Sequence, residues 1–267
     1  MSIGNTSKIA SSPFAVTLSV WRALFLRESI TRVTAGRAAW LWLLLEPIIH
    51  MSIMMFICTV IRVRVISGMH TAVWLTAGLL TMFMFMRTAS QTKNAINSNR
   101  QLFAYRQVKP IDTIFSRAFL ESFLTILIAF IMFASSFLLG FGVFPIDPLL
   151  LMSAFLGLWL TGLGYGLITS VISELIPEFD KVLKVAMGPI YMLSGVIFPI
   201  SNVPSPYREW LLYNPIAHGI ETARSSISPY YHSFAGLDIS YTFKWALISI
   251  FLGLVLHKRF AAQLVTK

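Results

Sequence analysis

Long apolar runs separated by short polar connections are the dominant pattern of this 267-residue chain. A bilayer core of about 30 Å is crossed by a helix of about 20 apolar residues. Six runs approach this length, at positions 38–61, 71–86, 114–144, 148–172, 182–200 and 241–257. The pattern therefore predicts an all-α membrane protein with six transmembrane helices.

The segment before the first run has a different pattern. Phe14, Leu18, Trp21 and Phe25 recur at helical spacing, and the nearby arginines fall away from that stripe. This arrangement is typical of an amphipathic helix that lies flat at the cytoplasmic surface of a membrane. The second interpretation is that residues 14–26 only flank the first span and serve as its stop-transfer signal.

The connection between the fifth and sixth runs, within residues 198–235, is also unusual. Pro199, Pro204 and Pro206 interrupt its start, and a second apolar piece at 210–221 is too short to span a bilayer. Broken apolar pieces of this kind favour re-entrant helices between spans 5 and 6, on the outer side of the membrane.

Composition supports a membrane protein, because only 12% of the residues are charged, whereas a soluble domain carries about 25%. Sixteen of the 21 Lys and Arg residues fall on one side of the predicted spans and five on the other. The positive-inside rule then places both termini in the cytoplasm, with residues 1–37 as a cytoplasmic N-terminal part and residues 38–267 as the transmembrane domain. Basic loops beside anionic lipid explain the net charge of +10, so no nucleic-acid partner is expected.

Motifs for catalysis are missing from the sequence. It contains no Gly-Lys-Ser/Thr phosphate loop, no HExxH and no CxxC, so the chain is expected to be non-catalytic and to bind no cofactor or metal itself. The single cysteine, Cys58, lies in an apolar run, where a small buried side chain is expected. Gly162 and Gly166 have the GxxxG spacing that lets two membrane helices pack closely.

A basic strip at residues 87–117 joins the second and third runs and carries six Lys or Arg residues. Such loops commonly serve only to fix topology. Its apolar residues favour a further role, because a short helix over 94–105 would present aromatic side chains to the cytoplasm for a partner protein. The candidate docking residues are Asn99, Arg100, Gln101, Leu102, Phe103, Tyr105 and Arg106.

Ionisable residues inside membrane segments indicate function by default. Glu46 in the first run either anchors this span near a cytoplasmic gate through an ion pair or hydrogen bond, or remains in the interface near a helix start. His218, Glu221 and Arg224 recur at about one helical turn. They form either a structural cluster or a contact with substrate at the outer mouth.

Four short sequence motifs occur at defined places among the predicted spans. They are Leu45-Glu46-Pro47, Gln107-Val108-Lys109-Pro110-Ile111-Asp112, Leu193-Ser194-Gly195-Val196-Ile197-Phe198-Pro199, and Leu212-Tyr213-Asn214-Pro215 with the polar row beyond it. With them, nearly the whole chain resembles the membrane subunits of ABC-2 type exporters, and among these the KpsM-type permeases of capsular polysaccharide export. Arg106 stands where that family commonly has proline, which adds a basic contact and leaves the geometry of the turn open.

The resemblance implies a homodimer of this chain bound to two copies of a separate ABC ATPase, which uses ATP and Mg. Residues 99–106 would form the coupling helix. A lipid-linked acidic polysaccharide would cross the bacterial inner membrane between the two permeases and continue to periplasmic and outer-membrane export proteins. Trp159 and Tyr165 would line this channel, because flat rings stack on sugar faces; ordinary helix packing is the other interpretation.

Two other functions fit parts of the pattern. The closer one is an ABC-2 permease for O-antigen, teichoic acid or a small drug. The more distant one is a membrane-embedded glycosyltransferase, which requires clustered Asp or His residues at the membrane surface. The acidic residues are scattered, and the one close group, Glu174, Glu178 and Asp180, lies in a short turn where it is expected to help dock the partner.

Overall fold

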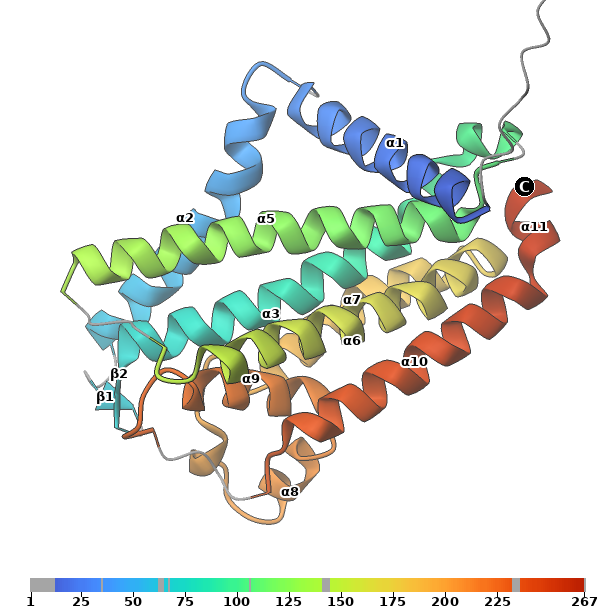
Figure 1. Ribbon diagram of the computed structural model, residues 1–267. Helices are drawn as coiled ribbons and strands as arrows, with labels where there is room; N and C mark the ends of the chain where they lie inside the picture. Colours follow the sequence, from blue (N-terminus) through green and yellow to red (C-terminus); the bar gives the residue numbers. More distant parts are fainter. Residues whose placement is uncertain are drawn as a thin grey trace, which may run out of the picture.

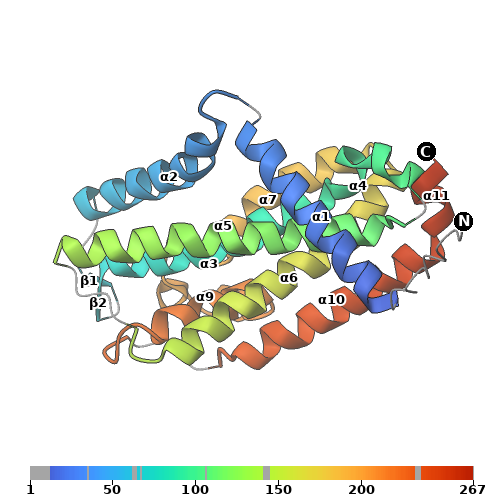
Figure 2. The same ribbon diagram turned by 45° about the horizontal axis from the view of Figure 1, so that its top comes forward.

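Helices form nearly all of the regular structure in the computed structural model, which describes residues 13–34, 36–61, 65–66, 68–105, 107–140, 145–231 and 236–266. In chain order the elements are α1 (Pro13–Thr34), α2 (Ala39–Ile61), β1 (Val65–Ile66), β2 (Met69–His70), α3 (Thr71–Lys93), α4 (Ala95–Ser98), η1 (Arg100–Ala104), α5 (Pro110–Leu138), α6 (Pro148–Leu175), α7 (Phe179–Leu193), η2 (Ile200–Asn202), α8 (Tyr207–Leu211), α9 (Pro215–Ser225), α10 (Ile239–Arg259) and α11 (Ala261–Thr266). The long helices run side by side. The segments α4 and α11 lie at one end of the bundle, and α8, α9 and the antiparallel pair β1–β2 lie at the other (Figures 1 and 2).

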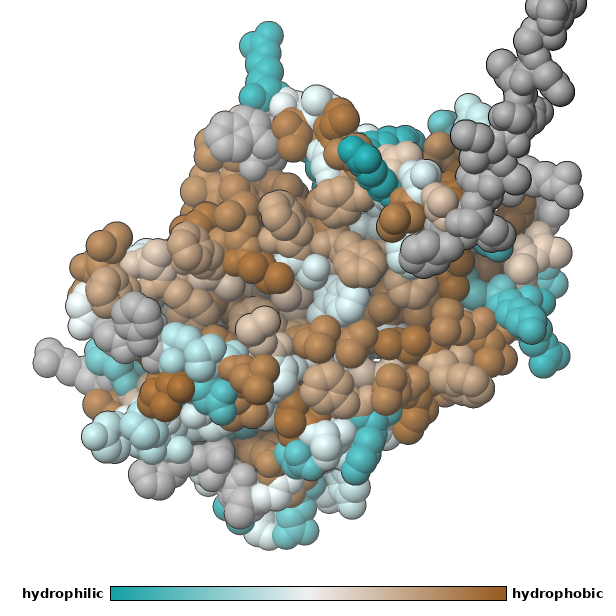
Figure 3. All heavy atoms as spheres, viewed as in Figure 1, coloured by the Kyte–Doolittle hydropathy of each residue, from teal (hydrophilic) through white to brown (hydrophobic). Residues whose placement is uncertain are grey.

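Five helices in the described part of the chain are long and apolar enough to cross a bilayer, namely α2, α3, α5, α6 and α10. The predicted class, an all-α membrane protein, is therefore confirmed. Hydrophobic side chains cover the middle of the face shown in Figure 3, and hydrophilic ones gather towards its edges. Helix α7 has only 15 residues, fewer than the about 20 that a complete span requires.

Local sequence rules explain where these helices end. Helix α6 stops before Ile176-Pro177, because a residue that precedes proline disfavours the helical conformation. Helix α7 stops at Leu193 because Gly195 takes a φ of +69°, the left-handed conformation common just after a helix. The predicted run at 182–200 is therefore too long at its C-terminal end, where the chain forms a turn and the short helix η2.

Helix α3 is the central element of the bundle, and 18 of its 23 residues are buried. Helix α6 packs on it through Gly162 and Gly166, as the spacing of the two glycines predicts. A Cβ atom at Gly162 would lie 2.8 Å from the carbonyl oxygen of Phe85, and one at Gly166 would lie 2.6 Å from the Cβ of Thr92. The two backbones approach so closely only because both residues lack a side chain.

Helix α1 crosses over α5 rather than running parallel to it (Figure 2). It continues well beyond the predicted segment at 14–26. Trp21 packs on Phe115 and Phe119 of α5, with ring centroids 5.4 and 6.3 Å apart. Leu18, by contrast, is 57% exposed. Helix α1 thus has one face bound to the bundle and apolar side chains open to its surroundings, the two properties of a helix at a membrane surface.

A larger side chain at Gly162 should weaken the contact between α3 and α6. Gly162→Val places methyl groups against the Phe85 carbonyl, so we expect overpacking to cost about 1–3 kcal/mol of stability. The measurement is the thermal unfolding temperature of the purified protein in detergent. Gly188→Ala is the matched control, because a Cβ there meets nothing within 4 Å. An unchanged unfolding temperature for Gly162→Val would contradict this packing role.

Candidate functional site

The strip between α3 and α5 folds into two short helical pieces, α4 and the 3-10 helix η1, which we call the α4–η1 segment (residues 95–104). The sequence predicts one helix over 94–105, and Asn99 is the residue at which it breaks. Asn99 is buried, with its Nδ2 donating to the Ala95 carbonyl at 3.0 Å. Its Oδ1 accepts from Arg27 of α1 at 2.9 Å, so α1 is bonded directly to this segment.

The two aromatic residues of the strip point in opposite directions. Phe103 is buried in an apolar cluster that includes Ile96, so the expectation that its ring faces the cytoplasm is wrong. Burying an aromatic ring is favoured by the hydrophobic effect. Tyr105 is 67% exposed. Gln101 is also exposed and Leu102 is half-buried, so these three side chains are accessible, whereas Phe103 is not.

Basic residues near this segment are paired within the chain. Arg100 bonds Glu174 at the end of α6, and Lys93 at the end of α3 bonds Asp180 in the first turn of α7. The acidic turn that was expected to dock a partner is therefore tied to the α4–η1 segment of its own chain. Arg106, another predicted docking residue, lies outside the described residues.

Five charged side chains from α1, α3 and α5 form a network beside this segment. Glu121 of α5 is fully buried and pairs with both Arg32 of α1 and Arg87 of α3, the Arg87 Nε lying 3.0 Å from Glu121 Oε2. Arg117 of α5 pairs with Glu28 of α1 at 2.9 Å. A buried carboxylate is costly unless it is paired, so Glu121 holds two other helices against its own.

The motif at the start of α5 connects α1 to the same region. Asp112 accepts from the backbone N–H of Lys109 at 2.9 Å through Oδ2 and from Trp21 Nε1 at 2.8 Å through Oδ1. Pro110 occupies the first turn of the helix, where a missing N–H removes no hydrogen bond. One carboxylate of this motif therefore caps α5 and fixes α1.

A second buried network lies at the opposite end of the bundle, where α9 meets α3. Arg224 is fully buried and donates to Glu221 Oε1 at 2.7 Å. It also donates to the carbonyls of Gly195 and Val196, at 2.8 and 2.9 Å. Its guanidinium carbon lies 3.5 Å from the centroid of the Trp74 ring, a cation–π contact. One side chain thus joins α9, α3 and the turn after α7.

Glu221 and His218 find their other partners within the chain. The Tyr231 hydroxyl donates to Glu221 Oε2 at 2.5 Å, and burial raises the pKa of Tyr231, so this donor keeps its proton. His218 Nδ1 accepts from the Asp238 N–H at 2.9 Å, and its Nε2 lies 2.8 Å from the Leu212 carbonyl. The predicted polar row is thus bonded within the protein, as a structural cluster requires.

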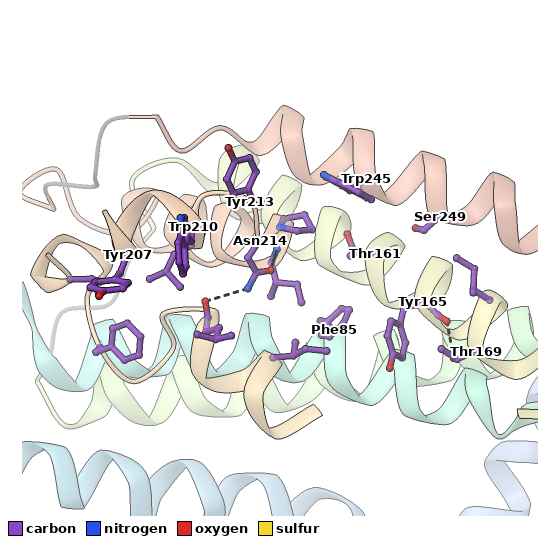
Figure 4. A pocket seen from close by; sticks show the side chains of 18 residues that line it. Phe85, Thr161, Tyr165, Thr169, Tyr207, Trp210, Tyr213, Asn214, Trp245 and Ser249 are labelled. Atoms are coloured by element: carbon purple, nitrogen blue, oxygen red, sulfur yellow. Dashed lines mark hydrogen bonds between the residues drawn. The ribbon is translucent and has the colours of Figure 1, made fainter. Parts of the chain in front are cut away.

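The two aromatic residues predicted to line a channel lie against different neighbours. Trp159 packs on Phe119, with ring centroids 5.3 Å apart, and donates from Nε1 to the Ala118 carbonyl at 2.9 Å. Tyr165 borders a mostly apolar cavity of about 800 Å³ between α3, α6, α7, α8, α9 and α10 (Figure 4). The aromatic residues around this cavity are Phe85, Tyr165, Phe198, Tyr207, Trp210, Tyr213 and Trp245.

Glu46 is exposed on α2, beside the buried Pro47 within that helix. It borders a separate, more polar groove of about 520 Å³ between α2, α3 and α7, which also contains Arg87. Helix α2 therefore carries its carboxylate at a groove rather than in the bundle core. In the part of the chain that the structure describes, no three His, Cys, Asp or Glu side chains could hold a metal ion together.

Sequence reasoning missed several residues on which the two networks depend. Glu121 and Arg117, one turn apart within a membrane-like run, were the available signal for the charge network, but their partners come from α1 and α3. Trp74 carries no signal of its own, because an aromatic residue in an apolar run is ordinary.

Comparison with known proteins supplies the family. Residues 19–228 match the family model described as ABC-2 type transporter. The chain belongs to this family. It is 34% identical over 250 residues to the polysialic acid transport protein KpsM of Escherichia coli, covering 94% of this chain and 96% of that protein.

Other ABC-2 relatives have related names. The chain is 28% identical over 245 residues to the capsule polysaccharide export inner-membrane protein CtrC of Neisseria meningitidis, covering 90% of each protein. It is 26% identical over 251 residues to the capsule polysaccharide export inner-membrane protein BexB of Haemophilus influenzae, covering 92% of this chain and 93% of that protein. Family membership and the apolar helices together make the chain a multi-pass membrane protein.

Removing the carboxylate of Glu221 should leave the buried charge of Arg224 without its ionic partner. We expect Glu221→Leu to lower stability by about 3–5 kcal/mol, the usual cost of removing one member of a buried pair. The measurements are the unfolding temperature and the yield of purified protein. Glu209→Leu, on the exposed surface of α8, is the matched control and should change neither. Equal stability of the two variants would show that the pair is dispensable.

Proposed function

We propose that this chain is the membrane-spanning permease of an ATP-driven exporter that moves lipid-linked capsular polysaccharide out across the bacterial inner membrane. The observation that carries this proposal is the similarity, over nine tenths of the chain or more, to proteins named for polysialic acid transport and capsule polysaccharide export. Because the sequence has no phosphate loop, two copies of a separate ABC ATPase use ATP and Mg to drive transport. The polymer leaves towards periplasmic and outer-membrane export proteins.

In this proposal the permease has six spans, both termini in the cytoplasm, and α8 and α9 as re-entrant helices. Helix α7 is the short fifth span, and the apolar turn after it completes the crossing. The Lys and Arg distribution supports the orientation, since α4, η1 and α11 lie at the basic end of the bundle. The Tyr and Trp residues of α8 fit an aromatic belt at the outer surface.

The α4–η1 segment is the proposed contact with the ATPase, as part of a coupling loop at 87–117. Gln101 in this segment and Tyr105 directly after it are exposed and accessible to a partner. A movement of the α4–η1 segment can be transmitted to the other helices through two contacts. One is the bond from Asn99 to Arg27 of α1, and the other is the adjacent pair of Lys93 with Asp180 of α7.

Two copies of the permease meet along α2 and α7 in this proposal. Helix α7 buries only Leu183 among its residues, and Val185 is 75% exposed. On α2, Phe56 is 68% exposed. These apolar faces border the polar groove, so a second copy packed against them encloses a path between the two chains.

The orientation can be tested by labelling introduced cysteines. Ser205 lies in the exposed turn before α8, so Ser205→Cys should react with a membrane-impermeant maleimide in intact spheroplasts. Asn97→Cys, exposed in α4, is the control and should react only after permeabilisation. The native Cys58 is buried and contributes little background. The reverse labelling pattern would overturn the proposed topology.

The contact with the ATPase can be tested at Tyr105. Tyr105→Ala removes an exposed ring and should reduce co-purification of the ATPase and surface polymer, because exposed aromatic residues are common anchors of interfaces. Membrane insertion and unfolding temperature should stay unchanged. Tyr230→Ala removes a similarly exposed tyrosine from the opposite end and is the matched control. Normal co-purification and export with Tyr105→Ala would argue against this contact.

A further inference from the structure

Four of the six polar side chains that line the groove between α2, α3 and α7 take no part in the two buried networks. Its volume of about 520 Å³ falls within the range of about 300–1,000 Å³ typical of small-ligand pockets. It lies along the C-terminal half of α3, towards the end of the bundle that holds the α4–η1 segment. The polar residues that line it are Glu46, His50, Arg87, Ser90, Gln91 and Tyr191.

One polar group of the groove has no partner of its own. The Tyr191 hydroxyl is buried, and the described part of the chain offers it no hydrogen bond. Buried polar groups in native proteins nearly always have a partner, so this hydroxyl indicates one that the chain does not supply. Arg87 contributes its charge from the other side of the groove, where Glu121 Oε2 holds its Nε at 3.0 Å.

The lining determines the chemical class of that partner. Glu46 accepts hydrogen bonds, and Arg87 donates them. Gln91 donates through its amide nitrogen, since its Oε1 already accepts from Arg32, while the rings of Phe83 and Tyr191 offer flat apolar faces. A pyranose ring has the same two kinds of surface, a rim of hydroxyls and apolar C–H faces. An acyl chain would leave the polar groups unsatisfied. The opposite charges of Glu46 and Arg87 give the groove no excess of positive charge for a phosphate headgroup.

We infer that this groove binds a sugar unit of the transported polymer in the cytoplasmic half of the permease, an inference that rests on the proposed function. Groups from α2, α3 and α7 contact the same sugar. Since α7 is paired with the end of α3 through Lys93 and Asp180, a shift of α7 changes the contacts with the sugar. Binding is thereby linked to the position of the α4–η1 segment.

Gly188 offers a way to fill the groove without disturbing the fold. It belongs to the groove lining, and a Cβ there meets nothing within 4 Å. We expect Gly188→Trp to abolish surface polymer and Gly188→Ala to retain it, with export measured in a host that lacks its own permease. Leu138→Trp adds bulk at an exposed position of α5, outside the groove lining and outside the proposed interface of α2 and α7, and should retain export. Co-purification with the ATPase shows that each variant assembles.

Occupancy of the groove can be measured directly with Gly188→Cys. The probe is a maleimide applied to the assembled transporter in membranes from cells that make the polymer and from cells in which polymer synthesis is blocked. We expect slower labelling when polymer is present, because a bound sugar covers the thiol. Labelling at equal rates in both membranes overturns the inference, including the case where a lipid headgroup slows both equally. This measurement decides the matter if Gly188→Trp fails to assemble.

The two proposals fail in distinguishable ways. If the wild-type chain restores surface polymer while Gly188→Trp exports equally well, the groove inference is wrong and the permease function stands. If the wild-type chain, assembled with its ATPase, restores no polymer, the proposed function is wrong and the groove inference falls with it.

Discussion

Glu121 is the charge on which the half of the molecule that holds the α4–η1 segment depends. It is fully buried, and its two oxygens pair with Arg32 of α1 and Arg87 of α3. In a medium of low dielectric such a carboxylate interacts strongly with every nearby charge, so its position dictates theirs. By fixing α1 across α5 it also sets the register in which Arg27 reaches Asn99 and Trp21 reaches Asp112. The crossing of α1 over α5 is thus a consequence of ion pairing as much as of apolar contact.

Helix α3 is the element that the two buried networks share. Arg87 and Lys93 near its C-terminal end take part in ion pairs, and Trp74 near its N-terminal end lies under Arg224. Space for the Arg224 guanidinium exists because α3 has glycine at position 78, where a Cβ would lie 2.3 Å from an arginine nitrogen. A central helix held by charged groups at both ends has little freedom to rotate about its axis, so it serves as the fixed reference for the helices around it.

Much of the fold could be predicted from local sequence. Apolar length identifies the five helices that are long enough to cross a bilayer, and proline or glycine marks the helix ends at Pro110, Ile176-Pro177 and Gly195. Other features depend on residues far apart in the chain, which no local pattern reveals. Phe103 turns inward because Leu264, near the C-terminus, helps to build the apolar cluster that receives it.

The candidate sites could be predicted only in part, for the same reason. The sequence shows that Glu221 and Arg224 share a helix face, and these two do form a pair. The carbonyl acceptors of Arg224 come from the turn after α7, and its aromatic partner comes from α3, so the full network appears only in three dimensions. The family resemblance indicates which segments matter without revealing these bonds.

Helix α7 is held at both ends and loosely supported between them. Its first turn is joined to the end of α3 by Asp180 and Lys93, and the turn after it is joined to the start of α3 by Arg224. In its C-terminal half, Pro189 lacks the N–H that would bond the carbonyl four residues earlier, which makes a helix easy to kink there. A helix that is held at both ends and easily kinked between them bends when one end is displaced. A displacement of the first turn of α7 therefore becomes a sideways movement at Gly188-Pro189, which changes the width of the groove between α2, α3 and α7.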